Sequence, residues 1–149
     1  MEFIIEIKEQ INLINEVLID LKQSLLLDNQ DFILDEMTAE RYLKLKYISP
    51  NHINFIITIT PFGTNIDVDR AMEAYDVGKE YVNNNKTDYK AFFLTLFTSR
   101  IKVEYFGSNY TKIYFYDDSG TCIKTLKFVT GLYLKIGCKI KEYSPIYTK

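Results

Sequence analysis

Histidine and cysteine are scarce in this chain of 149 residues, which contains only His52, Cys122 and Cys138. A structural zinc site needs four Cys or His ligands, so zinc-finger, di-histidine and iron–sulfur centres are excluded within one chain. His52 follows residues 49–51 (Ser-Pro-Asn), a combination typical of a turn that leads into a strand. We therefore expect His52 to be a turn or surface residue and not a catalytic base, and we expect no metal and no cofactor.

The two cysteines fall in apolar C-terminal stretches, where a free cysteine behaves as a small hydrophobic residue. Residues 1–6 are acidic, whereas a signal peptide begins with basic residues. Together with the two thiols, this predicts a protein of the reducing cytoplasm. A disulfide between Cys122 and Cys138 is the alternative. Because no apolar run reaches the roughly 18 residues that a membrane span needs, we expect no membrane association.

Glycine is also sparse, and the six glycines are scattered along the chain. Dinucleotide-binding and Walker-type loops need closely spaced glycines, so dehydrogenases and kinases of those types are excluded. With 47% hydrophobic and 26% charged residues, the composition is that of a globular protein and excludes disorder. The length fits a single domain over residues 1–149.

The clearest local pattern is a run of apolar residues at heptad spacing near the N-terminus. Its members are Ile4, Ile7, Ile11, Ile14, Leu18, Leu21 and Leu25. This spacing predicts an amphipathic helix over about residues 2–27. The seam suits a helix packed across a sheet of its own chain, and it suits equally a homodimer in which two such helices pair.

The rest of the chain alternates between connections, strands and short helices. Residues 28–40 read as a connection, and 41–48 with 53–60 read as a hairpin. Asp67 or Asp69 is expected to cap a helix over 70–83, which the run Asn83-Asn84-Asn85-Lys86 then breaks. For 88–99 a helix is favoured, with a strand as the alternative, because Phe92, Phe93, Leu96 and Phe97 share a helical face.

From residue 100 onward the pattern predicts strands joined by turns. The expected strands cover 100–105, 112–116, 121–129 and 132–141. The sequence therefore predicts an α+β fold, with a long N-terminal helix on an antiparallel sheet and a helical insert between the first hairpin and a C-terminal β-meander.

Charge is distributed unevenly along the chain. Residues 1–40 hold two lysines and ten carboxylates, a net charge of −8, whereas residues 41–149 hold sixteen Lys and Arg and ten carboxylates, a net of +6. Such polarity can steer a charged partner. From the acidic connection we expect four partner-binding residues: Asp28, Asp31, Asp35 and Glu36.

A second candidate surface lies in the predicted C-terminal sheet. Lys112, Tyr114 and Tyr116 share one strand face, opposite Ile113 and Phe115. Tyrosines between cations suit a protein interface, and they can also stack single-stranded bases. A pI near 5.5 and the lack of an RNP-type motif disfavour nucleic acid.

Three carboxylates form the only candidate for catalysis. Asp67 and Asp69 are two residues apart, so on an extended segment both side chains could hold one divalent cation, with Glu73 nearby. This pattern supports a metal-dependent hydrolase or nuclease as the alternative function. The main prediction is a non-catalytic protein-binding module, in the manner of a bacterial inhibitor or immunity-type protein with a dedicated protein partner.

Overall fold

The N-terminal helix forms as predicted but ends earlier. The computed structural model describes four stretches of the chain, residues 3–38, 41–76, 79–132 and 137–149. Helix α1 spans Ile5–Asp20. Beyond it Lys22 takes a left-handed φ of 58°, and its N–H donates to the Ile19 carbonyl at 2.9 Å while the Gln23 N–H donates to the Leu18 carbonyl at 2.8 Å. These two bonds form a Schellman motif. The heptad pattern predicts an end near residue 27, which is too late, because the left-handed position after the helix is usually a glycine and here is a lysine.

The heptad seam is part of the chain's own core. Ile7, Ile14 and Leu18 are 0% exposed and Ile11 is 6% exposed. Helix α1 packs against the second helix and the third strand. The core interpretation is therefore confirmed for residues 7–18, whose seam is buried within the chain itself.

The five-stranded sheet contains the predicted hairpin, β2 (Tyr42–Tyr47) and β3 (Phe55–Thr60). Its strands follow in chain order and pair antiparallel. The expected connection over 28–40 is wrong in part, because Phe32–Thr38 form the edge strand β1, with an irregularity between Leu34 and Glu36. A bulge and acidic side chains on an edge strand resemble a loop in sequence.

The predicted helix over 70–83 is wrong in its first half. Strands β4 (Gly63–Val68) and β5 (Ala71–Asp76) form a second hairpin there. Asp69 does not cap a helix but sits in the tight turn with a left-handed φ of 53°. Residues 71–76 have little strand propensity of their own, so pairing along the whole of β4 overrides it.

A single helix, α2 (Lys79–Thr98), follows this hairpin. It runs through residues 83–86, where a break was predicted, because asparagine only mildly disfavours a helix. The helix prediction for 88–99 is confirmed over the strand alternative. Phe92, Phe93 and Phe97 on its inner face are 2%, 0% and 0% exposed.

The C-terminal sheet has four strands in the order β8-β7-β6-β9. They are β6 (Arg100–Phe106), β7 (Tyr110–Tyr116), β8 (Cys122–Val129) and β9 (Cys138–Tyr143). The meander holds for β6 to β8, but β9 crosses to the free edge of β6. Of the strand predicted over 132–141, residues 133–136 lie outside the described part of the chain.

The two cysteines therefore stand on opposite edges of this sheet. Both thiols are free and exposed, so neither cysteine behaves here as a buried hydrophobic residue. Two strands separate β8 from β9, and neighbouring strands are about 4.8 Å apart, so the spacing between the thiols far exceeds the reach of a disulfide.

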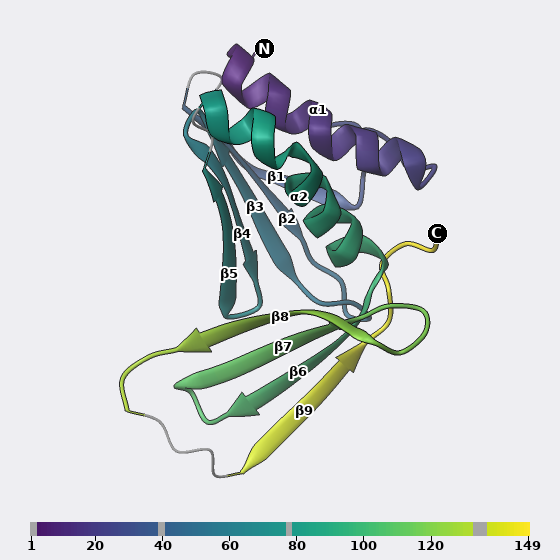
Figure 1. The fold of residues 1–149 in the computed structure, drawn as a ribbon, viewed down its shortest axis with the longest axis vertical. Helices are drawn as coiled ribbons and strands as arrows, with labels where there is room; N and C mark the ends of the chain where they lie inside the picture. The colour runs from purple at the N-terminus through teal and green to yellow at the C-terminus, as the bar shows by residue number, and fades with distance from the viewer. Residues whose placement is uncertain (1–2, 39–40, 77–78, 133–136) are drawn as a thin grey trace.

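The elements assemble into an α+β fold. In Figure 1, α1 and α2 lie side by side over one face of the five-stranded sheet, and the four-stranded sheet forms the opposite end of the molecule. Aromatic rings connect α2 to both sheets, through Phe97 with Phe55 of β3 and through Phe92 with Phe115 of β7. The C-terminal tail is bound to α2 by the Tyr147 N–H, which donates to the Phe97 carbonyl at 2.9 Å. No helix within the described stretches is long and apolar enough to span a membrane.

One buried hydroxyl in this core lacks a partner. Thr111 on β7 is 0% exposed, and its Oγ1 makes no hydrogen bond. We expect Thr111→Val to stabilise the protein by about 1 kcal/mol, because it removes an unpaired polar group without changing the shape of the side chain. Thermal unfolding should show a rise of about 2–4 °C in Tm. Thr125→Val, at an exposed position of β8, is the control and should leave Tm unchanged. A lower Tm for Thr111→Val would contradict the expectation.

Candidate functional site

The strand β7 presents the predicted tyrosines to solvent. Ile113 and Phe115 are buried beneath the sheet, whereas Lys112, Tyr114 and Tyr116 lie on the other side. The face shared by these residues is thus confirmed. The β6–β7 register places Arg100 opposite Tyr116 and Lys102 opposite Tyr114, on this same side. We call the surface formed by Arg100, Lys102, Lys112, Tyr114 and Tyr116 the outer face.

The tyrosine rings and the cations of the outer face are in contact. The rings of Tyr114 and Tyr116 stack with centroids 6.3 Å apart and planes 19° apart. Lys102 Nζ lies 4.5 Å from the Tyr114 centroid, and Lys112 Nζ lies 4.7 Å from it. The Arg100 guanidinium lies 5.2 Å from the Tyr116 centroid. Cation–π contacts of this kind hold the side chains in a defined arrangement before any partner arrives.

Carboxylates border this arrangement. Burial and a hydrogen bond to the Glu104 carboxylate raise the pKa of the Tyr114 hydroxyl, which therefore stays protonated at neutral pH. A hydrogen bond with Tyr116 raises the pKa of Lys102, and the charges of Glu104 and Glu142 act in the same direction. Lys102 is therefore a permanent cation at physiological pH.

The acidic residues predicted to bind a partner lie elsewhere, on the five-stranded sheet and the turn before it. Asp35 pairs with Lys46 at 3.3 Å and with Lys44 at 3.8 Å. Glu36 accepts a hydrogen bond from the Tyr42 hydroxyl at 2.7 Å, and Asp31 accepts one from the Tyr147 hydroxyl at 2.8 Å. Asp28 is exposed in the preceding turn. The structure does not join these residues to the outer face.

The three carboxylates of the hydrolase alternative are also separated. Asp67 and Asp69 line one cavity. Glu73 stands opposite the buried Ile66 in the β4–β5 register, so these two residues share one face of the sheet. Asp67 follows Ile66 in β4 and therefore lies on the opposite face from Glu73, which pairs with Lys124 at 3.0 Å. Within the described stretches, no group of three or more His, Cys, Asp or Glu side chains could hold a metal ion.

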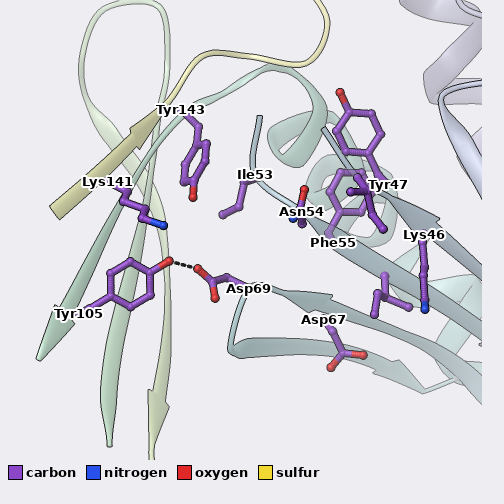
Figure 2. Close-up of a pocket in the computed structure, with 12 residues that line it drawn as sticks. Lys46, Tyr47, Ile53, Asn54, Phe55, Asp67, Asp69, Tyr105, Lys141 and Tyr143 are labelled. Atoms are coloured by element: carbon purple, nitrogen blue, oxygen red, sulfur yellow. Dashed lines mark hydrogen bonds between the residues drawn. The ribbon is translucent and has the colours of Figure 1, made fainter. Parts of the chain in front are cut away.

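A cleft lies where the two sheets meet, and we call it the junction cleft (Figure 2). It consists of two hollows of about 450 Å³ each, which share Asp69, Tyr105 and Lys141. In Figure 2, Tyr105 and Lys141 of the four-stranded sheet face Asp69 across the cleft, while Asp67 and Lys46 lie farther along the five-stranded sheet.

Asp69 and Arg70 in the β4–β5 turn tie the two sheets together. The Tyr105 hydroxyl donates a hydrogen bond to the Asp69 carboxylate. Burial, and then this bond, raise the pKa of the Tyr105 hydroxyl. Arg70 donates to the Gly107 carbonyl at 3.2 Å, and its guanidinium lies 5.3 Å from the Tyr105 ring centroid. These contacts explain why Asp69 keeps a backbone conformation that an aspartate adopts only at some cost.

Sequence reasoning missed the junction cleft, although the alternation of Lys139 and Lys141 in a predicted strand was a signal for one of its walls. Comparisons with protein-family models, with curated proteins and with solved structures found no match to this chain. The functional argument accordingly depends on the chemistry of the outer face and of the cleft.

Proposed function

We propose that this protein is a non-catalytic protein-binding module that recognises an acidic partner protein through the outer face, in the manner of an inhibitor or immunity-type protein. The observation that carries the proposal is the partly exposed pair of stacked tyrosines, with three cations held over their rings at 4.5 to 5.2 Å. Tyrosine and arginine are the residue types that most often anchor protein interfaces.

The arrangement suits a protein surface that carries carboxylates. Lys102, Lys112 and Arg100 are already held by the rings, so ordering them on binding costs little further entropy. Their charges would attract an acidic partner and set its orientation. The two free thiols, Cys122 and Cys138, suit a reducing compartment such as the cytoplasm.

Two features favour a protein over single-stranded nucleic acid. Cations lie over the ring faces of Tyr114 and Tyr116, where bases would have to stack. The carboxylates of Glu104 and Glu142 stand beside Lys102 and would repel the continuous row of phosphates of a nucleic-acid strand, whereas a folded partner protein can place carboxylates over the cations and hydrogen-bond donors over Glu104 and Glu142. The interface is proposed for the outer face and not for the four acidic residues: Asp31, Asp35 and Glu36 have partners within the chain, and Asp28 lies in the turn before β1.

The test is affinity capture from the native host with the wild-type chain and with the double variant Tyr114→Ala/Tyr116→Ala. The wild type should retain one protein in about equimolar amount, measured by mass spectrometry and by the absorbance of the eluate. Its recovery should fall about tenfold or more with the double variant, because tyrosines at the centre of an interface contribute most of its binding energy.

Tyr42→Ala is the matched control, because Tyr42 is also a partly exposed strand tyrosine, hydrogen-bonded to Glu36 on the other sheet. It should retain the partner in full, and circular dichroism should show all variants folded. Equal retention by the double variant would contradict the proposal. So would the recovery of nucleic acid that is lost steeply as salt is raised, which would instead assign the outer face to nucleic-acid binding.

A further inference from the structure

One of the two hollows in the junction cleft concentrates positive charge. Its charged side chains are Arg70 from the β4–β5 turn, Lys139 and Lys141 from β9, and Asp69. The local sum is therefore three cations against one carboxylate. Among the described residues, none of the three cations has a carboxylate oxygen within 4.0 Å. Without a bound anion, these charges repel one another.

Contacts hold two of the three cations: Arg70 is bonded to the Gly107 carbonyl, and Lys141 Nζ lies 5.9 Å from the Tyr105 ring centroid. Within the described part of the chain, one guanidinium nitrogen of Arg70 is bonded to the Gly107 carbonyl and the others make no hydrogen bond, so they can donate to a ligand. Lys139 and Lys141 are two residues apart on β9, so both extend from the same side of the strand. Gly107 has a φ of +66°, and a Cβ there would meet no atom within 4 Å, so the rim of the hollow is open.

We propose that this hollow binds the phosphate group of a small phosphorylated molecule. A phosphate monoester carries a charge close to −2 at neutral pH and offers three acceptor oxygens, which matches the excess charge and the separate donors of Arg70, Lys139 and Lys141. Arginine binds such groups through its planar fork, and lysine acts as a point charge.

The second hollow supplies room for the rest of the molecule. It continues from the shared residues Asp69, Tyr105 and Lys141 and is lined further on by Asn54, Phe55 and Tyr143. Aromatic and amide side chains of this kind accept a flat organic group, and about 450 Å³ lies within the range of small-ligand pockets.

This site is independent of the outer face. In the β6–β9 register, Glu142 pairs with Lys102, so Glu142 and Ile140 lie on the same side of the sheet as the outer face. Lys139 and Lys141 lie on the opposite side of β9. A ligand in the cleft and a protein on the outer face would therefore contact different sides of one sheet.

The test is isothermal titration of the purified full chain with phenyl phosphate and with inorganic phosphate, at constant ionic strength. Both should bind saturably with one site per chain, and phenyl phosphate should bind about tenfold more tightly, because its ring contacts the second hollow. The double variant Lys139→Gln/Lys141→Gln should weaken both by about tenfold or more.

Lys22→Gln/Lys127→Gln is the matched control, because it removes two exposed lysines that belong neither to the hollow nor to the outer face. It should bind both probes as the wild type does. Absence of saturable binding by the wild type, or an equal loss in the control, would overturn the proposal. Equal affinity for the two probes would overturn the role of the second hollow. None of these variants changes Tyr114 or Tyr116, so failure here leaves the proposed protein interface standing.

Discussion

Leu18→Glu is expected to leave the chain unfolded at room temperature. Leu18 is 0% exposed and lies on the face of α1 that packs against α2 and β3. An unpaired carboxylate at this position would lose its hydration, at an effective cost of several kcal/mol, and the leucine packing would be lost as well. Because a domain is stable by only about 5–15 kcal/mol, far-ultraviolet circular dichroism should show loss of helix and strand together.

Ile19→Glu is the matched control for this variant. It introduces the same charge one residue further along the helix, where the side chain is 57% exposed. It should fold with an unchanged Tm. A Leu18→Glu chain that folds and melts like the wild type would contradict the assignment of the heptad seam to the core. A folded variant with half the wild-type mass in solution would restore the dimer interpretation.

Phe97→Ala is expected to cost about 3–5 kcal/mol of unfolding free energy. Phe97 is 0% exposed, and its ring centroid lies 6.1 Å from that of Phe32, 6.2 Å from Phe55 and 5.8 Å from both Phe93 and Tyr147. These four rings come from β1, β3, α2 and the C-terminal tail. The cavity left by Phe97→Ala would therefore open where four segments of the chain meet. Urea unfolding should show a lower midpoint concentration, and thermal unfolding should show a fall of about 10 °C in Tm.

Phe62→Ala removes the same side chain from an exposed position. Phe62 lies in the β3–β4 turn and is 82% exposed, so its loss should change the unfolding free energy by less than about 0.5 kcal/mol. A comparable loss of stability in both variants would show that aromatic burial around Phe97 does not account for the stability of the fold.

Strong periodicity made parts of the fold predictable. The heptad spacing over Ile7 to Leu18, the alternation along 41–48 and 112–116, and the helical face of Phe92, Phe93 and Phe97 all correspond to elements with one buried side. In each case, burial of one side of the element requires apolar residues at the spacing of a helix or a strand, and this spacing can be recognised in the sequence.

The errors arose where distant parts of the chain decide the structure. Strand β5 exists because β4 offers it a complete set of hydrogen bonds, and nothing within residues 71–76 announces a strand. The position of β9 beside β6 is likewise set by packing between segments far apart in sequence. Such pairing leaves no local period to read.

The two sites divide along the same line. The shared face of Lys112, Tyr114 and Tyr116 followed from one strand, and the structure added Arg100 and Lys102 from its neighbour. The junction cleft is formed by the β4–β5 turn, β6 and β9 together, so the local sequence suggests only a helix cap or a metal site for the aspartates and no role for Arg70.

The measurement that tests the central claim most directly is lysine footprinting of the complex isolated by affinity capture. The free chain and the complex are treated briefly with an acylating reagent, and modification of each lysine is quantified by mass spectrometry. The account predicts that Lys102 and Lys112 react more slowly in the complex, while the exposed Lys22 beyond α1 reacts as before. Unchanged reactivity of Lys102 and Lys112, with protection of lysines on another surface, would contradict it.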